Sequence, residues 1–206
     1  MKFGGAKRLV LAGYAGEKIR VRLASNTFAM LQSDFKVKID DIKNRIDVDV
    51  IRKNEVTEAI EKETVSIFVQ IPTPDIGKVE CAVNAETVEI HSLVCDSIEL
   101  DVKTSNILLE DVAGTIEINC NLDMNILCGS LNGAVEINQM SATSKICVPE
   151  GLQFTAITKG IRTRISYEKN GKQVDAFDIH NVENIIELNG LNSELVICTL
   201  TKEAQH

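Results

Sequence analysis

The sequence predicts an all-β protein built around a short parallel β-solenoid with rungs of about 19 residues. One phrase of an apolar, an acidic and an apolar residue recurs four times, at steps of 19, 18 and 19 residues. The segments on both sides of this block alternate apolar and polar residues with the period of a β-strand. A fixed period near 20 residues is typical of stacked repeats, in which no single repeat buries its own apolar face.

Residues 1–73 are expected to form a β-rich N-terminal part. Alternating patterns predict strands over 18–23, 35–40, 46–50 and 65–71, and helical spacing predicts a short helix or long turn over 54–63. The apolar run 9–15 is only faintly similar to a secretory signal, because Glu17 and Lys18 cut it short, so no signal is expected. Pro72 and Pro74 lack a ladder donor and mark a boundary.

Residues 74–151 are expected to form the regular rungs, each with two strand-like runs. Glycines recur where the rungs would turn, and the repeat keeps one polarity, which favours parallel stacking over the alternative of a hairpin meander. The first runs contain the repeated phrase, at 79–81, 98–100, 116–118 and 135–137. The second runs place like residues in two columns: Ile90, Leu109, Cys128 and Cys147 in one, and Leu93, Val112 and Leu131 in the other.

Residues 152–206 lose this register and are expected to form irregular rungs and a C-terminal cap. Strands are predicted over 154–158, 161–167 and 173–179, the last two joined by the hairpin dipeptide Asn170-Gly171. The segments 185–188 and 195–198 resemble one degenerate final rung. The whole chain, 1–206, is interpreted as a single unit with capped ends.

The repeat block resembles the bacterial putative-adhesin domains of unknown function, whose rungs are short phrases of alternating Ile, Glu, Val and Gly. The likeness is clearest over residues 64–151. It implies a right-handed parallel β-helix without established catalytic residues, often secreted or membrane-anchored. At the rung corners, where that family has Ser-Gly-Asp, this chain has Ser105-Asn106, Met124-Asn125 and Thr143-Ser144.

Charge is distributed unevenly along the chain, whose net charge is -8. Residues 74–151 contain 3 basic and 13 acidic residues, which disfavours binding to nucleic acid phosphates. No apolar run is long enough to span a membrane. Six cysteines without a CxxC pair favour a reducing compartment, so the protein is predicted to be cytoplasmic, with export as the alternative.

An outward-facing column of glutamates is the first candidate binding feature. Stacked carboxylates could bind a basic protein partner, or Ca²⁺, which is not favoured; the plainer alternative is a solvated face that keeps the protein soluble. Beside this column a second column could form an amide ladder with a structural role. The acidic ladder consists of Glu80, Glu99, Glu117 and Glu136, and the amide column of Asp101, Asn119 and Asn138.

A basic face on the C-terminal hairpin is the second candidate binding feature. Arg162 and Arg164 alternate there with Ile161, Thr163 and Ile165, and they could support self-association with the acidic block or could be ordinary solvated charges. His91 is expected beside Glu110, and Cys128 beside Cys147 as core residues rather than a redox pair. No metal or cofactor site is predicted.

These features predict a non-enzymatic binding or scaffold module. The alternatives are a self-assembling structural protein and a carbohydrate-active β-helix enzyme. The enzyme is disfavoured because residues 78–151 contain no aromatic residue to stack on a sugar and no arginine to bind an anion.

Overall fold

The computed structural model describes residues 1–25, 31, 35–42, 45–53, 65–73, 76–175 and 183–200. In this part of the chain the elements are fifteen β-strands, which confirms the all-β class. Their bounds are β1 Lys2–Tyr14, β2 Arg20–Ser25, β3 Phe35–Ile42, β4 Arg45–Arg52, β5 Val65–Pro72, β6 Lys78–His91, β7 Val94–Val102, β8 Asn106–Glu110, β9 Ala113–Asn119, β10 Asn125–Cys128, β11 Asn132–Met140, β12 Thr143–Pro149, β13 Thr155–Lys169, β14 Lys172–Val174 and β15 Ile185–Leu200.

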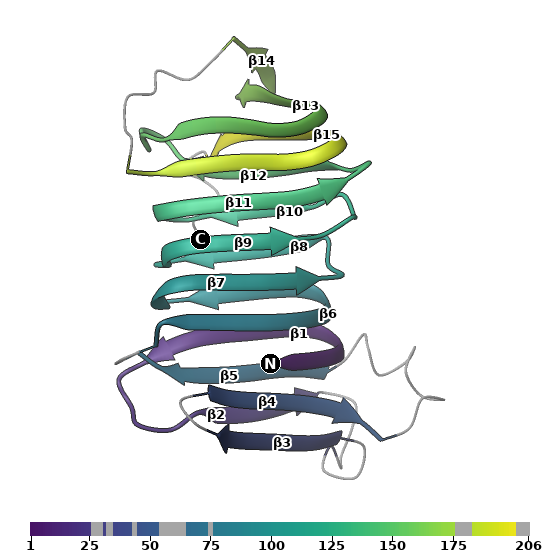
Figure 1. Ribbon diagram of the computed structural model, residues 1–206, viewed down its shortest axis with the longest axis vertical. Coiled ribbons are helices and arrows are strands. Elements are labelled where there is room, and N and C mark those ends of the chain that lie inside the picture. Colours follow the sequence, from purple (N-terminus) through teal and green to yellow (C-terminus); the bar gives the residue numbers. More distant parts are fainter. Residues whose placement is uncertain are drawn as a thin grey trace.

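Eight parallel strands form the centre of the molecule (Figure 1). Strands β7, β9 and β11 stack in one wall, and β8, β10 and β12 stack in the opposite wall. At one end β6 pairs with β7 through its first half and with β8 through its second half. At the other end β15 pairs in the same way with β11 and then β12. The ladder therefore returns to its starting strand.

The predicted fold class, an open right-handed parallel β-solenoid, is wrong. The strand order β6-β7-β9-β11-β15-β12-β10-β8 closes on β6 and forms an eight-strand parallel barrel, to which the other strands are added outside. The repeat step describes how neighbouring strands pair within a wall, but it does not describe how the walls are joined. They are joined at each end by one long strand, β6 with 14 residues and β15 with 16.

The predicted repeat register is confirmed in the first wall. One column of paired residues runs across β6, β7, β9, β11 and β15 and consists of Val79, Ile98, Ile116, Val135 and Ile186. Each of these side chains is buried between the walls. Because side chains alternate along a strand, this pairing turns the intervening glutamates outward.

In the second wall the predicted column is correct for three positions and wrong for the fourth. Ile90, Leu109 and Cys128 pair as expected. The next step is one residue longer, because Asn125 pairs with Lys145 and Leu127 pairs with Cys147. A one-residue change of register moves a side chain to the other face. Cys128 is therefore buried in the core, whereas Cys147 is outside the wall and half-buried.

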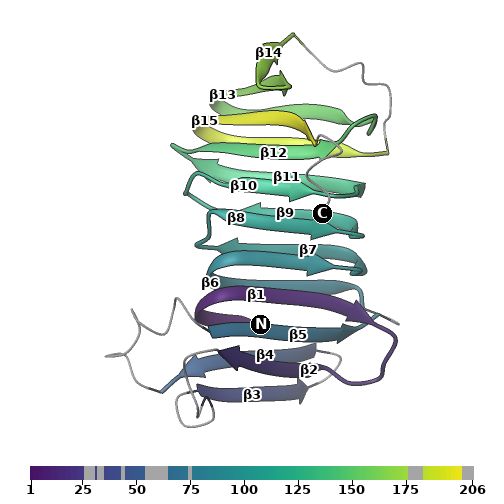
Figure 2. The same ribbon diagram turned by 180° about the vertical axis from the view of Figure 1, so that it is seen from behind.

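The N-terminal part contains the predicted strands and one that was not predicted. β2 and β3 pair antiparallel with β5 and β4, respectively. β1 inserts between β5 and β6 and runs parallel to both (Figure 2). Its apolar run belongs to the core, where Leu9 and Leu11 are fully buried. The predicted helix or turn at 54–63 lies outside the described residues.

The C-terminal part differs in order from the prediction. Residues 185–200 do form a rung, but it is not the final one, because β13 pairs with the far side of β15. β13 is one continuous strand where two were expected, and it ends in the predicted Asn170-Gly171 hairpin to β14. The structure therefore places an earlier segment of the chain outside a later one.

A buried polar cluster fixes β15 against the corner between β11 and β12. Gln139 donates from Nε2 to the carbonyl oxygens of Ala142 and Glu194, both at 3.0 Å. Ser144 donates to Gln139 Oε1 at 2.6 Å, and Ser193 donates to the Gln139 carbonyl at 3.2 Å. These bonds satisfy polar groups that would otherwise destabilise the core. The described residues contain no helix with the length and apolar character needed to cross a membrane.

Candidate functional site

The four glutamates of the acidic ladder lie in one outward column, as predicted from the repeat. Glu80 pairs with Glu99, Glu99 with Glu117, and Glu117 with Glu136. Glu187 of β15 extends the column to a fifth strand. The sequence contained a signal for Glu187, since Ile186-Glu187-Leu188 repeats the phrase of the rungs outside their regular spacing.

Internal partners neutralise much of this ladder. Lys78 Nζ lies 2.7 Å from Glu80 Oε1 and 2.9 Å from Glu99 Oε2, and these hydrogen bonds raise the pKa of Lys78. At the other end Lys159 Nζ lies 2.8 Å from Glu187 Oε1, which raises the pKa of Lys159. A lysine thus pairs with the acids at each end of the column. Among the described residues, no three His, Cys, Asp or Glu side chains converge as metal ligands.

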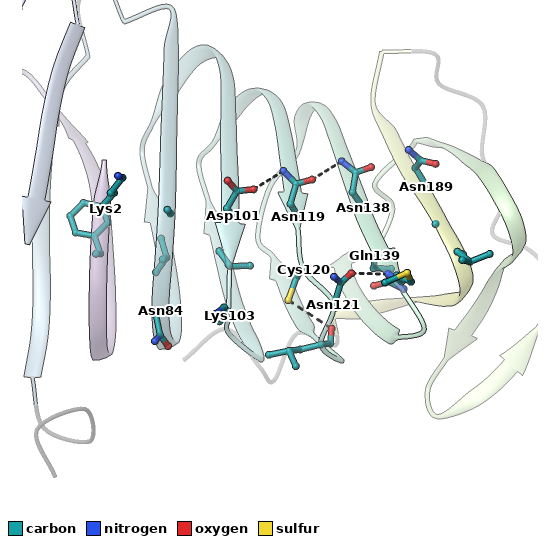
Figure 3. Close-up of a pocket in the computed structure, with 18 of the residues that line it drawn as sticks. Lys2, Asn84, Asp101, Lys103, Asn119, Cys120, Asn121, Asn138, Gln139 and Asn189 are labelled. Carbon is teal, nitrogen blue, oxygen red and sulfur yellow. Dashed lines mark hydrogen bonds between the residues drawn. The ribbon is translucent and has the colours of Figure 1, made fainter. Parts of the chain in front are cut away.

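The predicted amide ladder is present beside the glutamates. Asn119 Nδ2 donates to Asp101 Oδ1 at 3.0 Å, and Asn138 Nδ2 donates to Asn119 Oδ1 at 2.8 Å (Figure 3). Asn138 Nδ2 also donates to Glu117 Oε1 at 2.8 Å. Asn189 occupies the next position of the same column. The ladder holds these side chains in one orientation along the outside of the wall.

A groove of about 1250 Å³ runs along this ladder, across the strands. One side of the groove is formed by the outward residues Ala82, Asp101, Asn119, Asn138 and Asn189, one from each of five neighbouring strands, and all of them except Ala82 are polar. The residues that follow four of them also border the groove, although their side chains are buried: Val83, Val102, Cys120 and Gln139. The groove therefore lies where the wall bends.

The second side of the groove combines polar and apolar side chains. Its polar members Asn84, Lys103 and Asn121 lie below the amide ladder in Figure 3. Leu122, Met140 and Leu191 are exposed by 49, 52 and 40%. Asn121 Oδ1 accepts the backbone N–H of Met140 at 3.0 Å, and Met140 pairs with Leu191. We call Leu122, Met140 and Leu191 the apolar ridge. At its far end the groove reaches Lys2 and Phe3 of β1 and Val50 and Ile51 of β4.

The groove was not predicted, although part of it could have been. The column of Asp101, Asn119 and Asn138 was visible in the repeat. The bend of the wall and the contributions of β1, β4 and β15 are tertiary features that the repeat period does not specify. Lys2, Asp101 and Lys103 are the charged side chains among the described residues that line the groove.

A second polar cluster lies outside the other wall and includes the predicted pair of His91 and Glu110. His91 Nδ1 lies 2.9 Å from Glu110 Oε2, and His91 Nε2 lies 3.2 Å from Glu89 Oε2. Arg8 donates to both carboxylate oxygens of Glu89 through Nε and Nη2. Burial raises the pKa of Glu89, but the hydrogen bonds from Arg8 and His91 outweigh it, and the pKa lies below its ordinary value. These residues join β1, β6 and β8.

The predicted basic face maps to β13, the outermost strand. Arg164 forms an ion pair with Glu194 of β15, 2.5 Å between Nη2 and Oε2. Arg162 lies two residues earlier, with a φ of 55°. Part of this basic face therefore links β13 to its neighbouring strand.

Cysteine chemistry differs from the prediction. Cys147 and Cys198 lie side by side in β12 and β15, with 4.5 Å between their Cα atoms, and form a disulfide. The expected neighbours Cys128 and Cys147 are on opposite faces of the wall. Burial raises the pKa of both Cys81 and Cys128 to about 12, which makes these thiols unreactive in the folded protein.

Comparisons with known proteins add little to this geometry. No known family matches the sequence, and no curated protein is similar to it. One solved structure, a "putative cell adhesion protein" from Clostridium sporogenes, superposes with a TM-score of 0.44 and 10% sequence identity. That alignment covers 97% of this chain and 91% of the other.

Proposed function

We propose that this protein is a non-enzymatic binding module and that the groove beside the amide ladder holds an extended partner molecule. The observation that supports this proposal is the continuity of the groove across seven strands, from β4 and β1 through β6, β7, β9 and β11 to β15. With neighbouring strands about 4.8 Å apart, it is roughly 30 Å long. A linear ligand could contact equivalent groups on successive strands.

The chemistry of the lining supports binding rather than catalysis. Asp101 is the one carboxylate among the described residues that line the groove, and it accepts a hydrogen bond from Asn119. Catalysis by paired carboxylates requires a second acid within reach of the same substrate bond. Asparagine side chains instead supply neutral donors and acceptors, which orient a ligand without transferring protons.

An NMR titration with ¹⁵N-labelled full-length protein tests the proposal. The probes are linear polymers of different chemistry: cellohexaose, chitohexaose, poly-L-lysine and poly-L-proline. We expect at least one of them to shift the amide signals of Asn119, Asn138 and their groove neighbours. Shifts from none of these probes at millimolar concentration would contradict the proposal.

A matched pair of variants separates the groove from the rest of the surface. Asn119→Ala with Asn138→Ala removes the centre of the ladder. Asn106→Ala with Asn125→Ala removes two exposed, paired asparagines from the opposite wall. We expect binding to weaken in the first variant and to persist in the second. Equal losses in both would show that the groove is not the binding site.

A further inference from the structure

We infer that the ligand of the groove is a linear, uncharged polysaccharide with an extended β-linked backbone. This inference rests on the proposed binding function and specifies its ligand. It depends on the spacing, the hydrogen-bonding groups, the charge and the apolar side of the groove.

The spacing of the amide column favours a ligand whose repeating unit is about as long as the distance between two strands. The column contains one polar side chain per strand, from Asp101, Asn119, Asn138 and Asn189. Its polar groups are therefore spaced about 4.8 Å apart. An extended peptide advances by roughly 3.3 Å per residue, which does not match this spacing. A β-1,4-linked sugar chain advances per sugar by close to one strand spacing, so each sugar can lie beside one strand, although successive rings are turned over.

The unused hydrogen-bonding groups of the column include donors and acceptors. Asn119 uses one of its two N–H groups for Asp101, and Asn138 uses both of its N–H groups, for Asn119 and Glu117. The second N–H of Asn119 and the Asn138 Oδ1 atom remain available to a ligand. The Asn189 side chain forms no hydrogen bond within the described residues. Sugar hydroxyls both donate and accept, whereas an ammonium group only donates and a sulfate only accepts.

The charge of the groove favours a neutral ligand. Lys2 and Lys103 line it together with Asp101, so a polycation would meet two lysines. A polyanion would meet Asp101 and, in the next outward column, the carboxylates of Glu117 and Glu136. Like charges at this distance disfavour either ligand. A polysaccharide without carboxylates or sulfates avoids both costs.

The apolar ridge provides the second contact that a sugar ring requires. Pyranose rings have hydroxyl groups at the edge and C–H groups on the faces. The groove has amides on one side and the exposed Leu122, Met140 and Leu191 on the other. Aliphatic side chains bury less area per sugar than aromatic rings do, so we expect weak binding per sugar and a strong dependence on chain length.

Isothermal titration calorimetry with defined oligosaccharides tests the inference. Cellohexaose and chitohexaose are the probes, cellobiose tests length, and maltohexaose has the same sugar as cellohexaose in a coiled, α-linked chain. We expect at least one β-linked hexasaccharide to bind at least tenfold more tightly than cellobiose and maltohexaose. Asn119→Ala with Asn138→Ala should weaken binding at least tenfold, and Asn106→Ala with Asn125→Ala should leave it unchanged. Met140→Asp, at an exposed position, tests the ridge if the ladder variant does not fold, and should also weaken binding at least tenfold.

The possible failures are distinguishable. Binding of poly-L-lysine or poly-L-proline in the groove, without binding of the β-linked glycans, would overturn the inference and leave the binding module intact. Equal affinity for maltohexaose and cellohexaose would also overturn it, because the spacing would then play no part. If none of the probes binds in the groove, both the inference and the proposed function fail.

Discussion

Reduction of the disulfide between Cys147 and Cys198 should destabilise the protein substantially. The bond closes a loop across a sequence separation of 51 residues, which restricts the unfolded chain. The loop-entropy relation gives about 4 kcal/mol for a loop of this length. For a chain of this size that loss lowers the melting temperature by roughly 8 to 16 °C. It should also raise the urea m-value, because the reduced unfolded chain exposes more surface.

Urea unfolding of the oxidised and reduced protein measures this difference, and peptide mapping identifies the bond. The variant Cys147→Ser with Cys198→Ser is the control, because reductant should not change its stability. Thiol labelling of the oxidised protein should find four free cysteines after unfolding and slow reaction before it, since those four are buried. A difference below about 1 kcal/mol between the oxidised and reduced protein would refute the loop-entropy reasoning. A bond between other cysteines would refute the assigned pairing.

Two further predictions concern the walls of the barrel. Gly133→Ala should destabilise by at least about 2 kcal/mol in urea unfolding, because φ is +130° and the new Cβ would lie 2.3 Å from the Gly114 carbonyl oxygen. Gly171→Ala, with φ +71° and open space, should cost less, and a reversed order would contradict this account. Glu89→Gln should lower the free energy of unfolding by about 1 kcal/mol at pH 7, and not by more, because Arg8 is partly exposed and solvent weakens its ion pair with Glu89. The folded pKa of Glu89 is lowered, so its contribution is present above its unfolded pKa and disappears as the pH falls through the folded value. The difference from the unmodified protein should therefore shrink in unfolding experiments at acidic pH, and a constant difference would contradict the assigned ion pair.

The sequence predicted strand pairing correctly where a strand pairs with the equivalent strand of the next repeat. Ile98, Ile116 and Val135 could be placed in one column because a constant step and a period of two determine both the partner and the face. The same reasoning placed the glutamates outside and anticipated the contact between His91 and Glu110. A repeat pattern of this kind predicts which residue of the next strand lies beside a given residue.

The remaining features depend on strand pairings that produce no repeat in the sequence. β1 and β15 insert beside strands far away in the sequence, where any alternating apolar segment could have paired. The step between β10 and β12 is longer by one residue, and the cysteines at positions 128 and 147 concealed it because they fit the shorter step. Because of that additional residue, Cys128 is a buried free thiol, whereas Cys147 lies on the outer face and forms a disulfide with Cys198. The groove likewise depends on a bend that the repeat does not encode.

The positions of β1 and β15 affect the order in which the chain can fold. β13 is synthesised before β15, yet its long parallel partner is β15, so this end of the barrel cannot close before β15 has left the ribosome. Until then β11, β12 and β13 each present an unpaired edge. Such edges are sites of aggregation, and non-local parallel pairing is slow. A nascent chain therefore exposes these edges until β15 has been synthesised and has left the ribosome.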